Sequence, residues 1–345
     1  MKNQYRAFII FFNRLIAQYW IIFFLSLFWA QGCGTTSYST HPVYSRSLRG
    51  ITGTPSISFV SDTQSPLWFE KLRLQADNNE KATEKIFDSI AHDSTCTALF
   101  HLGDITGAGS DNSQWKIFDQ HALPLLNEKI PVYPAFGNHE YLFTEDGGKY
   151  NTLIRFPFLR PSWYARRIDS MAIVLLNSNI SKLSEAEKLA QETWYRSMMD
   201  SLDRDPSILM IIAGCHHSPY TNSTIVSPSE EVQKLFLPKF MKSKKAKLFI
   251  SGHSHAFEHF NIEGKDFLVI GGGGGLLHPL LQGNEQRWQD IFQHRDSRSF
   301  FHYCRLTRDK NMVNIEVHAL NSEANTFETI CKIELSYNIQ SSNNN

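Results

Sequence analysis

Five apolar runs in this sequence are each followed within a few residues by side chains that can bind a metal ion. The runs are residues 57–60, 98–102, 132–136, 208–213 and 247–250. The polar residues after them are Asp62, Asp104, Asn138 with His139, His216, and His253 with His255. Helix-like segments separate most of the runs, and this alternation is typical of βαβ units. Because ligands of open α/β sheets bind outside the carboxyl ends of the strands, we expect these side chains to meet in one place.

The wider pattern predicts an α/β protein. Helix-like spacing marks residues 79–91, 113–126 and 184–200 and the segment after Ser227 and Pro228. From residue 256 onward the pattern shows strands alone. A β-rich C-terminal half packed on a βαβ half predicts a four-layer αββα sandwich, with two stacked mixed β-sheets flanked by helices.

The composition argues against several classes of function. The 345 residues carry 34 Lys and Arg against 34 Asp and Glu, so no basic field exists to hold nucleic acid as a structural partner. The chain has 14 His and 5 Cys without a CxxC pair, which argues against zinc fingers and redox dithiols. Cys304 and Cys331, in two strand-like runs, are the one pair we expect to be able to form a disulfide.

The N-terminus resembles an export signal. Lys2, Arg6 and Arg14 precede an apolar run over 19–30, which is shorter than the roughly 20 residues of a membrane span. The run ends in an Ala-Gln-Gly-Cys sequence that resembles a bacterial lipoprotein cleavage site, with Cys33 as the lipid carrier. We therefore expect an exported protein tethered to a membrane, in the periplasm or on the cell surface. An uncleaved signal anchor is the alternative.

This interpretation divides the chain into four parts. They are a signal peptide of lipoprotein type over 1–32, a tether over 33–52, one large domain over 53–335 and a disordered tail over 336–345.

The order of the motifs resembles the calcineurin-like metallophosphoesterase family over most of residues 56–275. The motifs are Asp62-Thr63-Gln64, Gly103-Asp104, Gly137-Asn138-His139-Glu140, His216-His217 and Gly252-His253-Ser254-His255. Within that family, the last motif and the glycines over 271–275 look most like the purple-acid-phosphatase branch. Two positions depart from it. Gln64 stands where the family commonly has His, and Gly107 stands where that branch has an iron-binding Tyr.

The resemblance implies two bound metal ions, divalent or of mixed valence, with Fe, Mn and Zn as the candidates. One ion would be held by Asp62, Asp104 and His255, with Gln64 as a further ligand or as a hydrogen-bonding neighbour. The other would be held by Asp104, Asn138, His216 and His253, so that Asp104 bridges both.

The implied activity is hydrolysis of phosphate esters by a metal-bridging hydroxide, with monoesters as the expected substrates. Two divalent ions and two carboxylates leave a positive charge that suits a hydroxide and an anionic phosphate. Asp104 and His139 are the expected catalytic residues, and His139 would contact the phosphate or protonate the leaving group while Glu140 orients its ring. A phosphodiesterase acting on nucleotides or lipid headgroups, and a non-catalytic binding protein of the same fold, are the alternatives.

Several further residues are expected around the site. Residues 271–275 lack the spacing of a phosphate-binding loop and are interpreted as a turn that lets the backbone pass close to the metals. His217 is expected beside the ligands or at the rim, and His259 beside Glu258 or in solvent. The expected substrate rim comprises residues 141–150 and 220–227 and the segment with His278, Arg287, His294 and Arg295.

Overall fold

The computed structural model of the protein describes residues 41–44, 47–51, 54–72, 74–75, 78–292, 299–309, 312–323 and 325–336. All of the helices and strands described below belong to one compact unit, Pro42–Asn345. The expected signal peptide, Cys33, most of the tether and nearly all of the tail lie outside the described residues, so these assignments stay predictions. Within the described ranges no helix is both long enough and apolar enough to cross a membrane.

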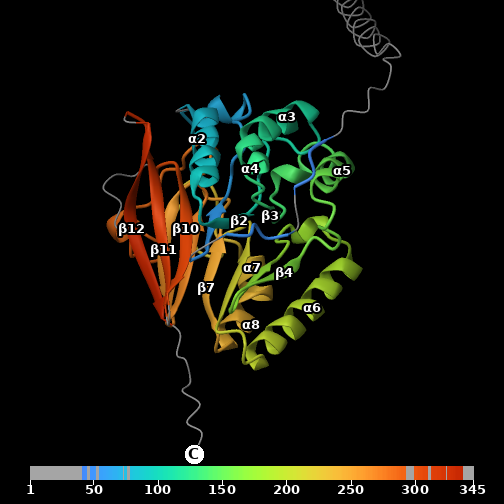
Figure 1. Ribbon diagram of the computed structural model, residues 1–345, viewed down its shortest axis with the longest axis vertical. Coiled ribbons are helices and arrows are strands. Elements are labelled where there is room, and N and C mark those ends of the chain that lie inside the picture. The colour runs from blue at the N-terminus through green and yellow to red at the C-terminus, as the bar shows by residue number, and fades with distance from the viewer. Residues whose placement is uncertain are drawn as a thin grey trace, which may run out of the picture. The chain divides into compact units, whose positions relative to one another are not determined.

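Two mixed sheets of six strands form the centre of the unit (Figure 1), as predicted. The first sheet has the order β12-β11-β10-β1-β2-β3. Its strands are β1 (Ser56–Val60), β2 (Cys96–His101), β3 (Val132–Pro134), β10 (His302–Asp309), β11 (Met312–Asn321) and β12 (Thr326–Ser336). The second sheet has the order β4-β5-β6-β7-β9-β8. Its strands are β4 (Tyr164–Ile168), β5 (Met171–Leu175), β6 (Met210–Cys215), β7 (Ala246–Ser251), β8 (Phe257–Ile262) and β9 (Lys265–Ile270).

Helices cover the sheets on both outer sides (Figure 1). The α-helices are α2 (Asn79–His92), α3 (Asn112–His121), α4 (Leu123–Asn127), α5 (Glu145–Arg155), α6 (Glu185–Arg204), α7 (Glu230–Leu235) and α8 (Leu237–Lys242). Short 3-10 turns are η1 (Glu70–Leu72), η2 (His139–Tyr141), η3 (Ile180–Lys182) and η4 (Gly283–Glu285).

Alternation along the buried strands produces the four layers. In β5, Ile173 and Leu175 belong to an apolar cluster that also contains side chains of the first sheet. The intervening Ala172 and Val174 belong to a second cluster with side chains of α6, α7 and α8. Because successive strand residues point to opposite faces, a fully apolar run like this one predicts a strand covered on both sides.

The sheets are not divided as the sequence predicts. We expected the C-terminal strands to form one sheet and the βαβ half the other. Instead β10 pairs antiparallel with β1, with Ile57 opposite Leu306, so β10 to β12 extend the N-terminal sheet. The middle of the chain forms the second sheet. The single helix expected over 113–126 is divided into α3 and α4. Pro124 lies in the first turn of α4, where proline is tolerated, but its ring cannot continue the preceding helix α3.

The expected disulfide is wrong. Cys304 and Cys331 are both free thiols, and both lie opposite Val317, on its two sides. Strand β11 therefore separates them by two strand spacings, about 10 Å, which is beyond the reach of a disulfide.

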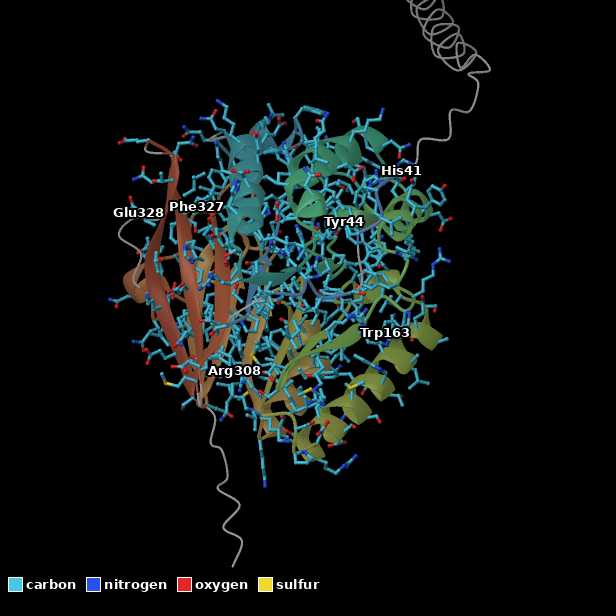
Figure 2. All side chains as sticks on the ribbon, viewed as in Figure 1. His41, Tyr44, Trp163, Arg308, Phe327 and Glu328 are labelled. Atoms are coloured by element: carbon cyan, nitrogen blue, oxygen red, sulfur yellow. The ribbon has the colours of Figure 1, made fainter. Side chains whose placement is uncertain are left out.

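Tyr44, close to the start of the described chain, is anchored in the domain (Figure 2). It is fully buried, and its ring stacks on Phe156 with 5.0 Å between centroids. Its N–H donates to the carbonyl of Arg155 at 3.1 Å. Tyr44, which falls within the expected tether over 33–52, therefore packs against the domain.

Helix α6 begins as its sequence predicts. The Ser184 hydroxyl accepts the N–H of Glu187, and the Glu187 carboxylate accepts the N–H of Ser184, which together form a capping box. Its buried residues Gln191, Tyr195 and Met199 are spaced four apart, so one narrow face contacts the sheet.

The capping box gives a test of this part of the fold. Ser184→Ala should lower the free energy of unfolding by about 1 kcal/mol, because the backbone N–H of Glu187 loses its capping partner and the Glu187 carboxylate loses the Ser184 hydroxyl. Ser197→Ala, on the exposed side of the same helix, should cause no loss. Chemical denaturation of both variants measures the difference, and equal stabilities would contradict the capping role.

Candidate metal centre

The carboxyl ends of β1, β2, β3, β6 and β7 bring the candidate residues together. Backbone hydrogen bonds join the turns after these strands. The N–H of Asp62 donates to Gly103 at 3.0 Å, and the N–H of Gly252 donates to His216 at 2.9 Å. The first bond joins the turns after β1 and β2, and the second joins the turns after β6 and β7. In each sheet, neighbouring turns are therefore fixed to each other.

The first cluster of donor atoms surrounds His255. Its Nδ1 donates to the carbonyl of Leu276 at 2.8 Å, which leaves the Nε2 lone pair facing the cluster. This Nε2 lies 3.4 Å from Oδ1 of Asp62 and 3.1 Å from the side-chain amide of Gln64. The amide nitrogen of Gln64 satisfies the backbone carbonyls of Asp62 and Asp104 when its oxygen faces His255. The lone pair of His255 Nε2 and a lone pair of the Gln64 side-chain oxygen then face each other in the protein interior, as two ligands of one ion would.

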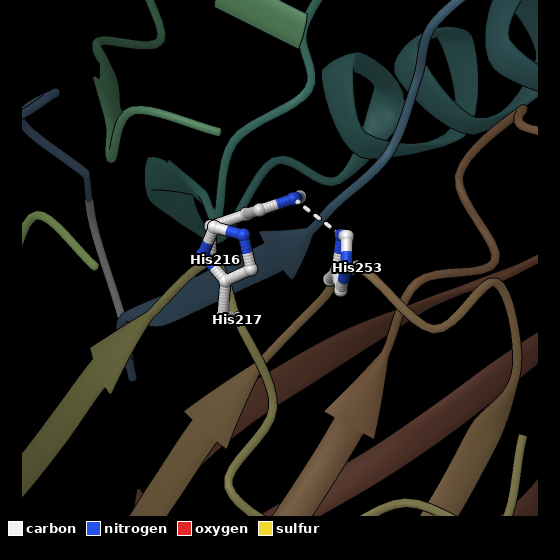
Figure 3. A group of neighbouring side chains, drawn as sticks. All are labelled: His216, His217 and His253. Carbon is white, nitrogen blue, oxygen red and sulfur yellow. Dashed lines mark hydrogen bonds between the residues drawn. The ribbon is translucent and has the colours of Figure 1, made fainter. Parts of the chain in front are cut away.

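The second cluster surrounds His216. Its Nδ1 donates to the carbonyl of Leu102 at 3.0 Å, so its Nε2 carries the free lone pair. This Nε2 lies 3.0 Å from Oδ1 of Asn138. It lies 3.2 Å from Nδ1 of His253, as the dashed line in Figure 3 marks. It also lies 3.2 Å from Oδ2 of Asp104. Four atoms with lone pairs therefore converge here.

These separations suit shared metal ions. Ligand atoms about 2.1 Å from one ion lie about 3.0 to 3.4 Å from each other in octahedral or tetrahedral coordination. Asp104 Oδ2 is buried without a hydrogen-bond donor, and such an atom requires a positive partner. Burial alone would lower the pKa of His216, but the Asp104 carboxylate raises it to about 9. A proton on His216 Nε2 would therefore occupy the place of the cation when no metal ion is bound, and a metal ion that binds there would displace it. Asp104 also groups with Asp62 and His255, and it therefore belongs to both clusters.

His217 lies beside the second cluster. Its ring is 5.0 Å from the His216 ring and 4.5 Å from the His253 ring (Figure 3). Its Nδ1 is hydrogen bonded to the Ser178 hydroxyl at 2.9 Å. Burial and the neighbouring His216 lower the pKa of His217 to about 3, so its ring is neutral. These three rings form a second possible metal-binding group that the sequence interpretation did not include.

His139 points its Nε2 toward the clusters. Its Nδ1 donates to the carbonyl of Gly107 at 2.6 Å. Its Nε2 lies 3.8 Å from Asp104 Oδ2 and 3.8 Å from Glu70 Oε1. Burial opposes protonation of the ring, but the Asp104 carboxylate and the Gly107 carbonyl raise the pKa of His139 above its usual value. The arrangement favours a ring that can hold and donate a proton.

Glu140 does not orient that ring, in contrast to the prediction. Its fully buried carboxylate accepts the backbone N–H groups of Asp104, Ile105 and Gly137 at 2.9, 2.8 and 2.7 Å. Burial and the nearby Asp104 carboxylate raise the pKa of Glu140 to about 7, while the three N–H donors stabilise its ionised form. Glu140 therefore fixes the turn after β2 to the turn after β3.

The family assignment follows from the sequence match over this region. Residues 55–257, more than half of the 345 residues, match the model of the calcineurin-like phosphoesterases. The chain belongs to the calcineurin-like phosphoesterase family. Membership implies divalent metal ions, for which the two clusters offer the ligands. A search of curated protein sequences found no match.

Solved structures share the fold of this family member. A purple acid phosphatase from yellow lupin seeds, Lupinus luteus, is 18% identical with a TM-score of 0.60, covering 82% of this chain and 54% of that one. The chain thus spans about half the length of the lupin protein. GAP50, the anchor in the inner membrane complex of Plasmodium, is 14% identical with a TM-score of 0.61, covering 83% and 89%. A dimetal phosphatase from Danio rerio is 10% identical with a TM-score of 0.52, covering 83% and 99%.

Glycines let the backbone of this phosphoesterase approach the clusters. A Cβ atom on Gly137 would lie 2.1 Å from Asp104 Oδ1, and one on Gly275 would lie 2.3 Å from the His255 ring. The N–H of Gly275 donates to the Asp62 carbonyl at 2.8 Å. Gly275, in the segment interpreted as a turn that lets the backbone pass close to the metals, therefore lies close to the first cluster.

Gly107 leaves no room for the tyrosine of the purple-acid-phosphatase branch. A Cβ atom there would lie 2.5 Å from the carbonyl oxygen of Ser65. A larger residue would require the backbone after Gln64 to move, so the departure seen in the sequence is built into the fold.

The expected rim is only partly correct. Glu145 begins helix α5, so residues 145–150 are not a loop. His278 is buried and stacks on His255 with 4.3 Å between ring centroids. Arg287 donates to two backbone carbonyls of the loop after β6, while His294 and Arg295 lie outside the described residues.

His259 pairs with neither of its expected partners. Its Nε2 lies 2.8 Å from Oδ1 of Asp266, on the neighbouring strand β9. Glu258 instead accepts hydrogen bonds from Thr221 and Asn222, at 2.5 and 2.6 Å.

Sequence reasoning missed a sixth strand end. Asn177, Ser178 and Asn179 follow β5, and Ser178 holds His217. The amide of Asn177 donates to Tyr141, and the amide of Asn179 donates to the carbonyl of Phe136, which ties this turn to the turn that carries His139. The rule applied to the other five runs would have found this turn from the apolar run over 171–176, which ends just before Asn177.

Glu140 provides the test of how the centre is positioned. Glu140→Gln should lower the free energy of unfolding by about 2 to 3 kcal/mol, because an amide nitrogen would face a backbone N–H in the core. Metal affinity should fall with it, since the turns that carry Asp104 and Asn138 lose their common anchor. Denaturation and calorimetric metal titration measure the two effects.

Glu145→Gln is the matched control. Glu145 is an exposed residue that pairs with Lys182, so its loss should change stability and metal affinity little. Equal effects of the two substitutions would contradict the positioning role of Glu140.

Proposed function

We propose that this protein binds two divalent metal ions and hydrolyses phosphate esters, with monoesters preferred over diesters. The observation that supports this proposal most strongly is the convergence of two sets of lone-pair donors on either side of Asp104, at ligand-to-ligand distances.

The proposed ligands of the first ion are Asp62, Gln64, Asp104 and His255, and those of the second are Asp104, Asn138, His216 and His253. The carbonyls of Leu276 and Leu102 support this division, because each fixes one imidazole with Nε2 facing its cluster. Gln64 and Asn138 contribute neutral amide oxygens, which are harder ligands than imidazole and favour Mn, Fe or Mg over Zn.

Bound divalent ions supply the Lewis acidity that acidifies water and neutralises phosphoryl oxygens. Asp62 and Asp104 carry only two negative charges, so they leave the centre attractive to a dianionic phosphate monoester. The side chains of Asn138, His139 and His253 are only half-buried, so substrate reaches the centre from their side.

His139 is proposed to assist the leaving group. The Gly107 carbonyl fixes its Nδ1–H, so the proton that can be transferred is on Nε2, the atom nearer to the clusters. An imidazolium here would donate that proton to the ester oxygen as the bond to phosphorus breaks.

Two other functions would use the same residues. A phosphodiesterase needs the same clusters and differs in the rim, while a non-catalytic binding protein could have the fold without turnover. Turnover of para-nitrophenyl phosphate and of its bis-ester, measured with metal content, separates the three possibilities. A protein without bound metal, and without activity after Mn, Fe or Zn is supplied, would contradict the enzyme proposal.

Asp104→Asn tests the shared ligand. The new amide can still accept the N–H of His139, so the fold should persist, but the loss of the bridging charge should remove metal and activity together. Elemental analysis and circular dichroism measure the two. Asp88→Asn, whose side chain is 49% exposed on α2, should retain both ions. A metal-replete Asp104→Asn protein would contradict the assignment.

His139→Ala tests the leaving-group role. The variant should keep its metals yet lose roughly 10² to 10⁴ in rate on alkyl phosphates, whose poor leaving groups need a proton. The loss on para-nitrophenyl phosphate should be clearly smaller, while His92→Ala, at an exposed helix end, should change neither rate. Equal losses on both substrates would instead indicate that His139 binds phosphate.

A further inference from the structure

The segment Leu67–Leu72 projects large apolar side chains into solvent beside His139. The relative exposures are 75% for Trp68, 41% for Phe69 and 80% for Leu72. These are three of the eleven exposed large hydrophobic residues in the described part of the chain, and they fall within five positions. Grouped apolar exposure of this kind marks a binding surface more often than isolated exposed residues do.

Contacts fix this segment against the candidate site. Glu70 Oε1 lies 3.8 Å from Nε2 of His139, and Glu70 Oε2 accepts the N–H of Leu67 at 2.6 Å. A Cβ atom on Gly107 would lie 3.3 Å from the Leu67 side chain, so Leu67 packs on the turn whose carbonyl orients His139. The segment that carries the exposed apolar residues therefore lies on the His139 side of the site.

We propose that this segment receives the alcohol part of the substrate and selects phosphate esters of uncharged alcohols that carry an aromatic or bulky apolar group. The proposal rests on the proposed function, because it takes the phosphate to be held at the two clusters. Glu70 Oε1 lies 3.8 Å from His139 Nε2, and Trp68 and Leu72 are each two positions from Glu70 in the chain. An alcohol that extends from a phosphate at the clusters past His139 would therefore reach this segment.

The negative charge of Glu70 adds a preference for uncharged alcohols. Its carboxylate lies 3.8 Å from His139 Nε2, beside the path proposed for the alcohol, and its side chain is only 22% exposed. An alcohol with a further phosphate or carboxylate group would be repelled there, whereas an uncharged aromatic group can stack on Trp68. Because this segment contacts His139 through Glu70, we expect the substrate, and not a membrane, to occupy its apolar surface.

Binding of phosphonates tests the proposal without depending on turnover. The metal-loaded protein should bind naphthylmethylphosphonate at least about ten-fold more tightly than methylphosphonate in calorimetric titrations. The double variant Trp68→Ala with Leu72→Ala should remove most of this difference and leave methylphosphonate binding unchanged. Leu189→Ala, an equally exposed apolar residue on α6, is the matched control and should change neither affinity.

Three results would overturn the proposal. They are equal affinity of the wild-type protein for the two phosphonates, an unchanged preference in the double variant, and a preference lost equally in Leu189→Ala. Loss of sedimentation with phosphatidylcholine vesicles in the double variant, with the phosphonate preference intact, would assign the surface to a membrane instead. Tight naphthyl binding without hydrolysis of any ester would refute the proposed function and leave this inference standing.

Glu70→Gln tests the charge selection separately. The substitution should raise kcat/KM for 4-carboxyphenyl phosphate relative to phenyl phosphate by about three-fold or more, since a repulsive charge next to the leaving group is removed. An unchanged ratio would show that Glu70 does not face the alcohol.

Discussion

The buried carboxylate of Asp104 is the group around which the whole centre is organised. One of its oxygens accepts the N–H of His139, and the other has no hydrogen-bond donor in the core. A carboxylate in this state is costly unless positive charge lies beside it. The turns of both sheets deliver imidazole and amide donors and one further carboxylate, Asp62, to its two sides, so folding creates a place that favours cations.

Backbone groups, more than side chains, set the geometry of this place. The carbonyls of Leu102, Leu276 and Gly107 each orient one imidazole ring. Glu140 in turn holds the backbone of two turns through three N–H groups. The rings are therefore fixed by the same strands that form the core, and little reorganisation is needed when ions bind.

The strand-end rule predicted the candidate ligands because it depends only on local pattern. An apolar run fixes where a strand ends, and the polar residue after it must lie at the sheet edge. Local pattern does not encode contacts between distant segments. Such contacts decide the role of Glu140, the hydrogen-bond partner of His217 and the sheet that β10 joins. The Cys304 hypothesis failed for the same reason, since strand order decides which cysteines are neighbours.

Anomalous diffraction from crystals of the Mn-loaded protein tests the central claim most directly. Two peaks are expected, one among Asp62, Gln64 and His255 and the other among Asn138, His216 and His253, with Asp104 between them. A single peak coordinated by His216, His217 and His253, or no peak at either cluster, would contradict the dinuclear account.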